Sequence, residues 1–111
     1  MDIYRFDPEH AVQAHENTIL AAPVLPAEFK CPFEHAWGYL AGPGKMEVHT
    51  HEDKQEYYCF FEGEGFVELN GVKSPVRCGD IVLVRPHVAH SVINEQNLPL
   101  KWAAFWWLVI K

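Results

Sequence analysis

The sequence predicts an all-β domain, either a sandwich or a barrel, made of roughly eight short strands. Apolar and polar residues alternate over short stretches, as they do on half-buried strands. Turn signals rich in Gly, Pro, Asn and Asp separate these stretches. One of them, Asn70-Gly71, is a strong hairpin signal. With 111 residues, 49% of them hydrophobic, the chain is predicted to form one domain with a substantial core.

Residues 1–34 are predicted to form an irregular arm that precedes the barrel. Prolines at four positions break any long helix or strand here: Pro8, Pro23, Pro26 and Pro32. The arm has room for one short helix between Glu9 and Ala22, with Asp7 as its cap. His10 and His15 are expected to be surface residues, because neither has a second ligand at a suitable spacing.

The barrel is predicted to span residues 35–111. Its predicted strands are 35–41, 45–51, 56–62, 66–69, 72–77, 81–85, 90–94 and 100–110. The strand 81–85 begins with four apolar residues and is ended by Pro86, and it is predicted to be buried. The last strand is apolar on both faces, and only one face can fill the barrel. The other face needs a cover from the arm or a second subunit, so we expect a homodimer.

Three residues around a short connection have the types and spacing of a metal site. His49 and His51 lie two apart on a predicted strand, so their side chains point to the same face. The four residues between His51 and Glu56 are charged or amide side chains and suit a loop. Glu56 then opens the next strand and can face back toward the imidazoles. Two imidazoles and one carboxylate suit Fe(II), Mn(II), Zn(II), Co(II) or Ni(II), although two solvated strand histidines would give the same pattern.

Composition argues against several other classes of protein. The formal net charge of −6 disfavours nonspecific binding to nucleic acid or to an anionic membrane surface. Three cysteines without a Cys-x-x-Cys pair fit neither a disulfide framework nor a thiolate zinc site. The first residues lack the features of a signal peptide, and no run reaches the ~20 apolar residues of a membrane span. We expect a cytoplasmic protein whose partner is a small-molecule substrate.

Two motifs in the chain resemble those of the cupin family. The first cupin motif contains a glycine, His-x-His, a Glu and a second glycine; here these are Gly42 or Gly44, His49, His51, Glu56 and Gly63. The second contains Gly-Asp, a proline-rich turn, a His and an Asn; here these are Gly79, Asp80, Pro86, His90 and Asn94. The resemblance extends from Trp37 to Trp106.

The resemblance implies a jelly-roll barrel, also called a double-stranded β-helix, with a metal in its interior. It implies that the metal ligands are His49, His51, Glu56 and His90. Two positions depart from the family pattern: Arg85 stands where a proline is frequent, and His87 where a glycine is frequent. Arg85 is a candidate to bind a substrate carboxylate or phosphate, and His87 a candidate acid or base. Both are also explained as solvated turn residues.

Aromatic side chains are predicted to line a cavity beside the metal. Tyr58 and Phe60 share the strand parity of Glu56. Trp102 or Trp106 is expected to cap or floor the cavity, although core packing explains all of these aromatic residues as well. One further residue, Glu47, shares a face with the two histidines and is a candidate proton acceptor or hydrogen-bonding partner.

The function expected from these features is that of a metal-dependent enzyme acting on a small molecule. An Fe(II) centre would make it a dioxygenase, whereas a metal acting as a Lewis acid would make it an isomerase, decarboxylase or lyase. The alternative is a module that binds a sugar or another small metabolite without turnover.

Overall fold

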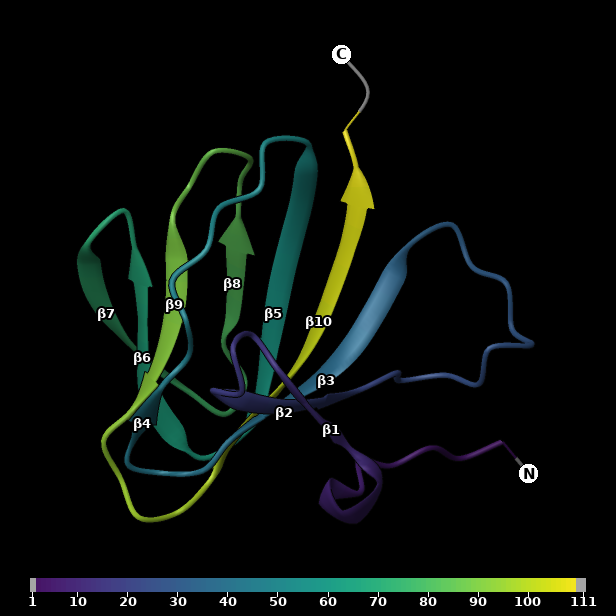
Figure 1. Cartoon of the computed structure of the whole chain (residues 1–111), viewed down its shortest axis with the longest axis horizontal. Coiled ribbons are helices and arrows are strands. Elements are labelled where there is room, and N and C mark those ends of the chain that lie inside the picture. The colour runs from purple at the N-terminus through teal and green to yellow at the C-terminus, as the bar shows by residue number, and fades with distance from the viewer. Residues whose placement is uncertain (1, 110–111) are drawn as a thin grey trace.

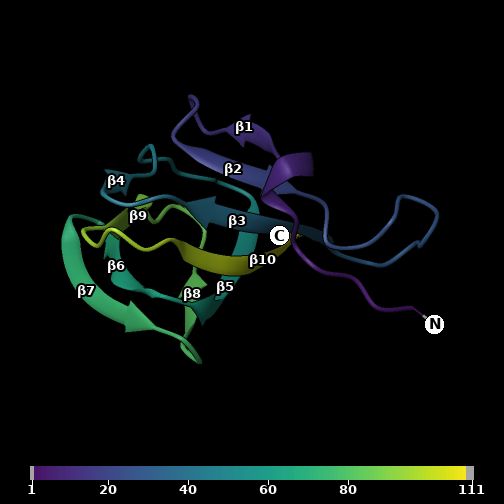
Figure 2. The same ribbon diagram turned by 90° about the horizontal axis from the view of Figure 1, so that it is seen from below.

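The computed structural model describes residues 2–109, which form two antiparallel sheets (Figure 1). The strands are β1 Val12–Ala14, β2 Ile19–Ala22, β3 Glu34–Leu40, β4 Gly44–Lys45, β5 Lys54–Glu62, β6 Glu64–Leu69, β7 Val72–Arg77, β8 Ile81–Val84, β9 His90–Asn94 and β10 Leu100–Leu108. The six-stranded sheet has the order β1-β2-β3-β10-β5-β8, and the four-stranded sheet the order β4-β9-β6-β7. Figure 2 shows the two sheets curving around a common interior. The predicted all-β architecture is confirmed; the predicted end of the last strand, Ile110, lies outside the described residues.

The β6–β7 hairpin turns at Asn70-Gly71, as predicted. These residues have φ angles of 49° and 81°, and a two-residue turn of type I′ requires positive φ at both positions. Asn70 also bonds to the loop before β9: its N–H donates to the Ala89 carbonyl, and its side-chain oxygen accepts the Ala89 N–H. These two bonds hold the backbone next to His90, the first residue of β9.

The N-terminal segment contains a hairpin where the sequence suggested a short helix. Asp7 does cap a helical turn, because its side chain accepts the Glu9 N–H, but this 3-10 helix, η1, spans only Pro8–His10. Strands β1 and β2 then pair with each other, and β2 pairs with β3 at the edge of the larger sheet. Ile19 of β2 is buried in the core. Such tertiary burial outweighs weak helical propensity in a segment this short.

Two other predicted strands differ from the observed ones. The predicted strand 45–51 pairs regularly only over β4, and beyond it a single bridge joins His49 to His90. The predicted buried strand 81–85 is instead the edge strand β8, where Ile81 is 68% exposed and Leu83 is 47% exposed. Alternate residues of a strand point to opposite faces, so Val82 and Val84 face the interior while Ile81 and Leu83 point to the outer face of the sheet, which none of the described residues covers at this place.

The core is strongly aromatic where it borders β5 and β10. Glu56, Tyr58 and Phe60 are all buried, which confirms the predicted parity of β5. Trp102 of β10 is 2% exposed and packs against Tyr58 and Phe60, with ring centroids 6.0 and 5.8 Å apart. Gly38 of β3 lies against this indole, and a Cβ at its position would be 2.1 Å from Trp102 Cε2. The glycine therefore makes room for the tryptophan that fills the barrel.

The outer face of the six-stranded sheet is apolar and only partly covered. Phe6 of the N-terminal arm stacks on Tyr39 with 5.6 Å between ring centroids, and it meets Trp37 edge-on. Phe105 is packed against Tyr57 on the same face. The arm thus covers one part of this face, as expected. Within residues 2–109 there is no helix with the length and apolar character of a membrane span.

Candidate metal centre

Four side chains from three parts of the chain meet near the start of β9. His49 and His51 come from the segment between β4 and β5, Glu56 from β5, and His90 from the start of β9. One ligand atom of each lies within 4.8 Å of those of the others. The bridge between His49 and His90 contains reciprocal backbone hydrogen bonds of 3.1 and 2.9 Å. The structure therefore brings together all four residues that the sequence motifs singled out.

Hydrogen bonds to carbonyl groups fix the form of two of the imidazoles. Nδ1 of His49 lies 3.0 Å from the Glu47 carbonyl oxygen, and Nδ1 of His90 lies 2.9 Å from the Val88 carbonyl oxygen. Since a carbonyl only accepts, each Nδ1 carries the hydrogen and donates it. Nε2 of each neutral ring is then left with a free lone pair, which is the form that binds a metal.

The atoms at the centre of the group lack other partners. Nε2 of His90 and Oε1 of Glu56 are buried without a hydrogen bond, and they face each other at 3.3 Å. Nε2 of His51 lies 3.9 Å from the same carboxylate oxygen. Buried polar atoms are nearly always satisfied, so two such atoms in contact indicate a missing common partner. A divalent cation fits this set of three nitrogens and one oxygen.

Burial also shifts the pKa values of side chains at this site. It lowers the pKa of His49 to about 4, and it lowers the pKa of His51 below the ordinary value for histidine. The imidazoles are therefore neutral at neutral pH, so a metal displaces no proton from them. Burial, together with the charge of Glu56 and a hydrogen bond to it, raises the pKa of Tyr58 well above its ordinary value. Tyr58 consequently keeps its hydroxyl proton beside the carboxylate.

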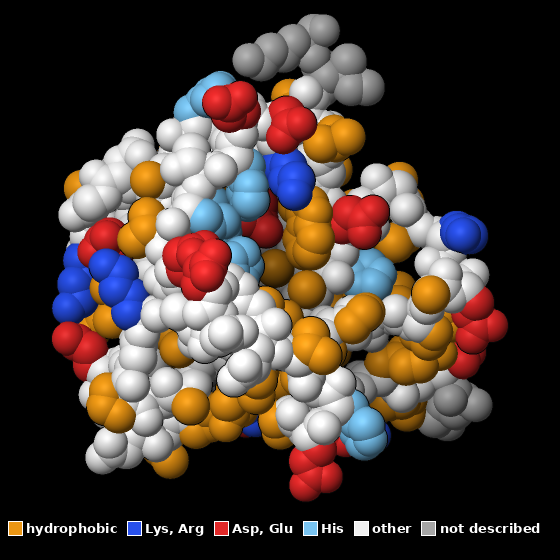
Figure 3. Space-filling view, viewed as in Figure 1, with side chains coloured by type: hydrophobic (Ala, Val, Ile, Leu, Met, Phe, Trp, Pro, Cys, Tyr) orange, Lys and Arg blue, Asp and Glu red, His pale blue; other side chains and the backbone are white. Residues whose placement is uncertain are grey.

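A cavity of about 140 Å³ adjoins the four converging residues, since His51 and Glu56 are part of its lining. Figure 3 shows histidine side chains gathered on the face where it opens, with acidic and hydrophobic side chains beside them. The residues of its lining that matter here are His15, His51, Lys54, Glu56, Tyr58, Trp102 and Trp106. Three of the aromatic residues proposed from the sequence thus line it. Phe60 does not, because it points one step deeper into the core, where it is 2% exposed.

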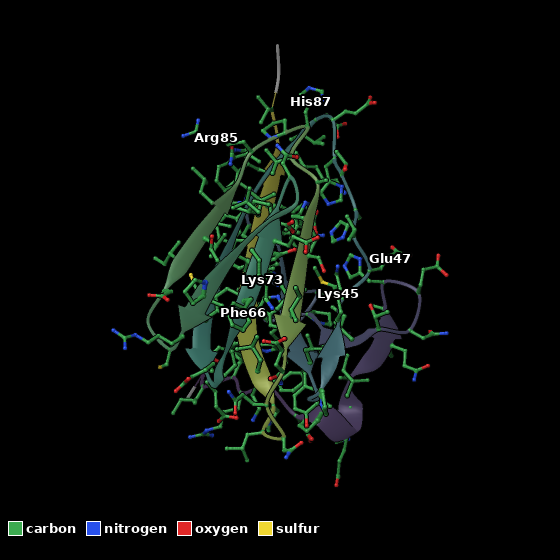
Figure 4. All side chains as sticks on the ribbon, turned by 90° about the vertical axis from the view of Figure 1, so that its left-hand side faces the viewer. Lys45, Glu47, Phe66, Lys73, Arg85 and His87 are labelled. Atoms are coloured by element: carbon green, nitrogen blue, oxygen red, sulfur yellow. The ribbon has the colours of Figure 1, made fainter. Side chains whose placement is uncertain are left out.

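Arg85 and His87 are not brought to the cavity. Both side chains are exposed on the turn after β8, and Figure 4 shows them at the top of the barrel, apart from Glu47. His87 acts through its backbone, since its N–H donates to the His51 carbonyl at 2.7 Å. Glu47 is half-buried next to the ligand segment and is not one of the four converging residues, so its role as a proton acceptor stays a prediction.

Sequence reasoning missed two residues at this site. Lys54 lies at the start of β5 and borders the cavity, close enough to His51 for its charge to act on that imidazole. His15, expected to be a surface residue, also borders the cavity, and its ring stacks on that of His49. The spacing of His15 to the other histidines carries no periodic signal, because the contact depends on how the β1–β2 hairpin packs. Lys54 was visible only as part of the charged connection.

Comparison with known proteins identifies the family of this chain. A family model described as a cupin domain matches residues 37–110, well over half of the chain. The chain belongs to the cupin family. This cupin resembles a Cupin 2 conserved barrel domain protein from Salinispora arenicola, with a TM-score of 0.84 and 24% identity, over 96% of this chain and 88% of that one. The jelly-roll fold implied by the motifs is thereby confirmed.

Two further similarities extend this comparison. A predicted oxalate decarboxylase from Thermotoga maritima matches with a TM-score of 0.74 and 27% identity, over 82% of this cupin and 81% of that chain. An uncharacterised protein of Methanocaldococcus jannaschii is 35% identical over 57 residues, which are 51% of this chain and 46% of that protein. The match therefore spans less than half of this relative's length. All four candidate ligands lie within the residues matched by the family model.

Proposed function

We propose that this cupin is a metal-dependent enzyme that acts on a small carboxylic acid. The observation that carries the proposal is the convergence of four metal-binding side chains at the end of a cavity. A divalent transition metal held by His49, His51, Glu56 and His90 would supply a Lewis acid, or a centre for dioxygen chemistry if it is Fe(II). The chain's own residues would bind the substrate, orient it and limit its contact with water.

The size and charge of the cavity favour a small anion. A volume of about 140 Å³ is small for a ligand site and favours a small substrate. The ammonium group of Lys54 provides a cation on the lining that can pair with a carboxylate. Trp102 and Trp106 provide apolar walls that exclude water. Similarity to a predicted oxalate decarboxylase supports the same substrate class.

Lewis-acid chemistry and dioxygen chemistry are separated by one set of measurements. Freshly purified protein, never exposed to chelator, is analysed for metal and then tested against a panel of small carboxylates, thiols and phenols. Oxygen uptake selects a dioxygenase, whereas carbon dioxide release or isomerisation without uptake selects Lewis-acid chemistry. The alternative function, binding without turnover, is favoured if a sugar raises the melting temperature and no product forms.

Two variants make this experiment specific. His90→Ala should lose the metal while keeping a folded barrel, because its ring nitrogen is one of the four converging atoms. Lys54→Met should retain the metal and bind a small carboxylate more weakly, because only the cationic end of the side chain is removed. Protein that contains no metal and takes up none on titration would overturn the proposal.

We also propose that two copies associate through the outer face of the six-stranded sheet. The support is the apolar character of this face, where Phe61, Ile81 and Leu83 are among the exposed residues. The N-terminal arm covers the face around Trp37 and Tyr39, whereas Ile81 and Leu83 lie on β8, at the edge of this sheet. An exposed apolar surface of this kind is unfavourable in water and is stabilised by an identical apolar surface.

A further inference from the structure

The β1–β2 hairpin lies outside the residues matched by the family model, yet its turn reaches the metal centre. Figure 1 shows this turn in front of the barrel, near the segment that joins β4 to β5. The imidazole of His15 stacks on that of His49, with ring centroids 4.3 Å apart and planes inclined by 27°. Oγ1 of Thr18 accepts the backbone N–H of Glu47 at 3.0 Å. The hairpin thus contacts both the ring of His49 and the backbone just before it.

The turn holds His15 in a defined position. His15, Glu16 and Asn17 have φ angles of 52°, 56° and 62°, a left-handed conformation that residues with side chains adopt only when surrounding contacts maintain it. Thr18 supplies such contacts, since its N–H bonds to the carbonyls of Ala14 and His15 and its hydroxyl donates to the His15 carbonyl. The turn therefore fixes the backbone that carries His15, and the imidazole packs against the ring of His49.

We propose that His15 is a positioning residue of the metal centre, whose flat ring fixes the orientation of the His49 imidazole. The His49 ring is held at one atom by the hydrogen bond that its Nδ1 donates to the Glu47 carbonyl, at 3.0 Å. That bond alone permits the ring to tilt, and tilting would turn the Nε2 lone pair away from the other ligands. The stacked ring of His15 blocks this motion. Partners that orient ligands in this way typically change metal affinity by about 10- to 100-fold.

Stacking, and not a hydrogen bond, is the interaction that His15 offers. Its imidazole meets that of His49 nearly face to face, with ring centroids 4.3 Å apart. A different flat ring should therefore replace it, whereas a side chain of similar volume without a flat ring should not. The inference rests on the metal centre of the proposed function.

The test is Co(II) binding to metal-free wild-type protein and to His15→Ala, His15→Leu and His15→Phe. Competition with a chelator gives the affinity, and the visible absorption of bound Co(II) reports the ligand geometry. We expect Ala and Leu to weaken binding by about tenfold and to change the spectrum, with Phe staying within about threefold of wild type. His10→Ala is the matched control, because this imidazole is 82% exposed and bonded to Asp7, and it should behave as wild type.

Each alternative outcome overturns the inference in a recognisable way. Unchanged affinity and spectrum in both Ala and Leu would mean that His15 does not position His49. A Phe variant as weak as Ala would mean that stacking is not the interaction. Thermal melts of the metal-free variants identify a loss of Co(II) affinity that a weakened fold causes. Such a loss would go with a lower melting temperature and would leave the spectrum of bound Co(II) unchanged. A wild-type protein that binds no Co(II) would reject the metal centre itself, and the inference with it.

Discussion

Replacing Glu56 by Gln should stabilise the metal-free protein and weaken metal binding. In the metal-free state, Oε1 of Glu56 and Nε2 of His90 are both acceptors, are both buried, and lie 3.3 Å apart without a hydrogen bond. A Gln amide in the same place can donate to the His90 nitrogen. One net hydrogen bond contributes about 1 kcal/mol, and removing a buried unsatisfied acceptor adds a comparable amount. We expect a gain of about 1–2 kcal/mol, or roughly 5–10 °C in melting temperature for a chain of this length.

The metal affinity of Glu56→Gln should fall, although the stability of the metal-free protein rises. The substitution removes the only anionic member of the four-residue group. Mutation of a group that contacts only a ligand typically changes metal affinity by about 10- to 100-fold, so loss of a direct ligand should lower the affinity at least tenfold. Calorimetry of the metal-free protein and titration with Zn(II) measure the two effects separately. Glu47→Gln is the control, because it changes the charge near the same histidines without touching the buried pair, and it should alter stability by less than about 0.5 kcal/mol.

The result that would refute this reasoning is a metal-free Glu56→Gln protein that melts at or below the wild-type temperature. That outcome would mean that the contact between Glu56 and His90 does not destabilise the wild-type protein in the absence of metal. Unchanged metal affinity would instead remove Glu56 from the ligand set.

Three further predictions concern the fold and its surface. Gly38→Ala should destabilise the protein by about 2 kcal/mol in urea unfolding, because its Cβ would lie 2.1 Å from the Trp102 ring; a cost below about 0.5 kcal/mol would contradict the observed packing. The metal-free protein should lose stability as pH falls from about 6.5 toward 4, because burial lowers the pKa of His49 to about 4 and the unfolded chain takes up the proton first; His49→Gln should flatten this dependence. Light scattering at micromolar concentration should give the mass of a dimer, and Leu83→Lys should shift it toward a monomer; a monomeric wild type would reject the proposed interface.

Much of the barrel could be predicted because the signals involved are local. Asn70-Gly71 specifies its own hairpin. The alternation along β5 puts Glu56, Tyr58 and Phe60 on the interior face, whichever strands are its neighbours. The convergence of the four candidate ligands could be predicted from the order and spacing of the two motifs, which fix where each residue lies on its strand or loop. None of these features depends on the order of the strands in the sheets.

Features that depend on strand order or on packing could not be predicted. Ile81 and Leu83 belong to an apolar run that is equally compatible with a buried strand, and they are exposed because they point to a part of the outer face that the described residues leave uncovered. His15 reaches His49 only because the β1–β2 hairpin adds to the larger sheet beside β3. Arg85 was proposed as a substrate contact from its place in the second motif, but the turn after β8 directs it to solvent.

The candidate ligands are held in place by backbone bonds that do not require a metal. His49 and His90 exchange two backbone hydrogen bonds, and the His51 carbonyl accepts the His87 N–H. The carboxylate of Glu56 is carried by the central part of the larger sheet, where β5 pairs with β10 on one side and β8 on the other. A small metal site built on loops alone would fold only when loaded. Here the sheets already fix the positions of the ligands, so metal binding should raise the melting temperature of a folded protein without changing its far-ultraviolet circular dichroism.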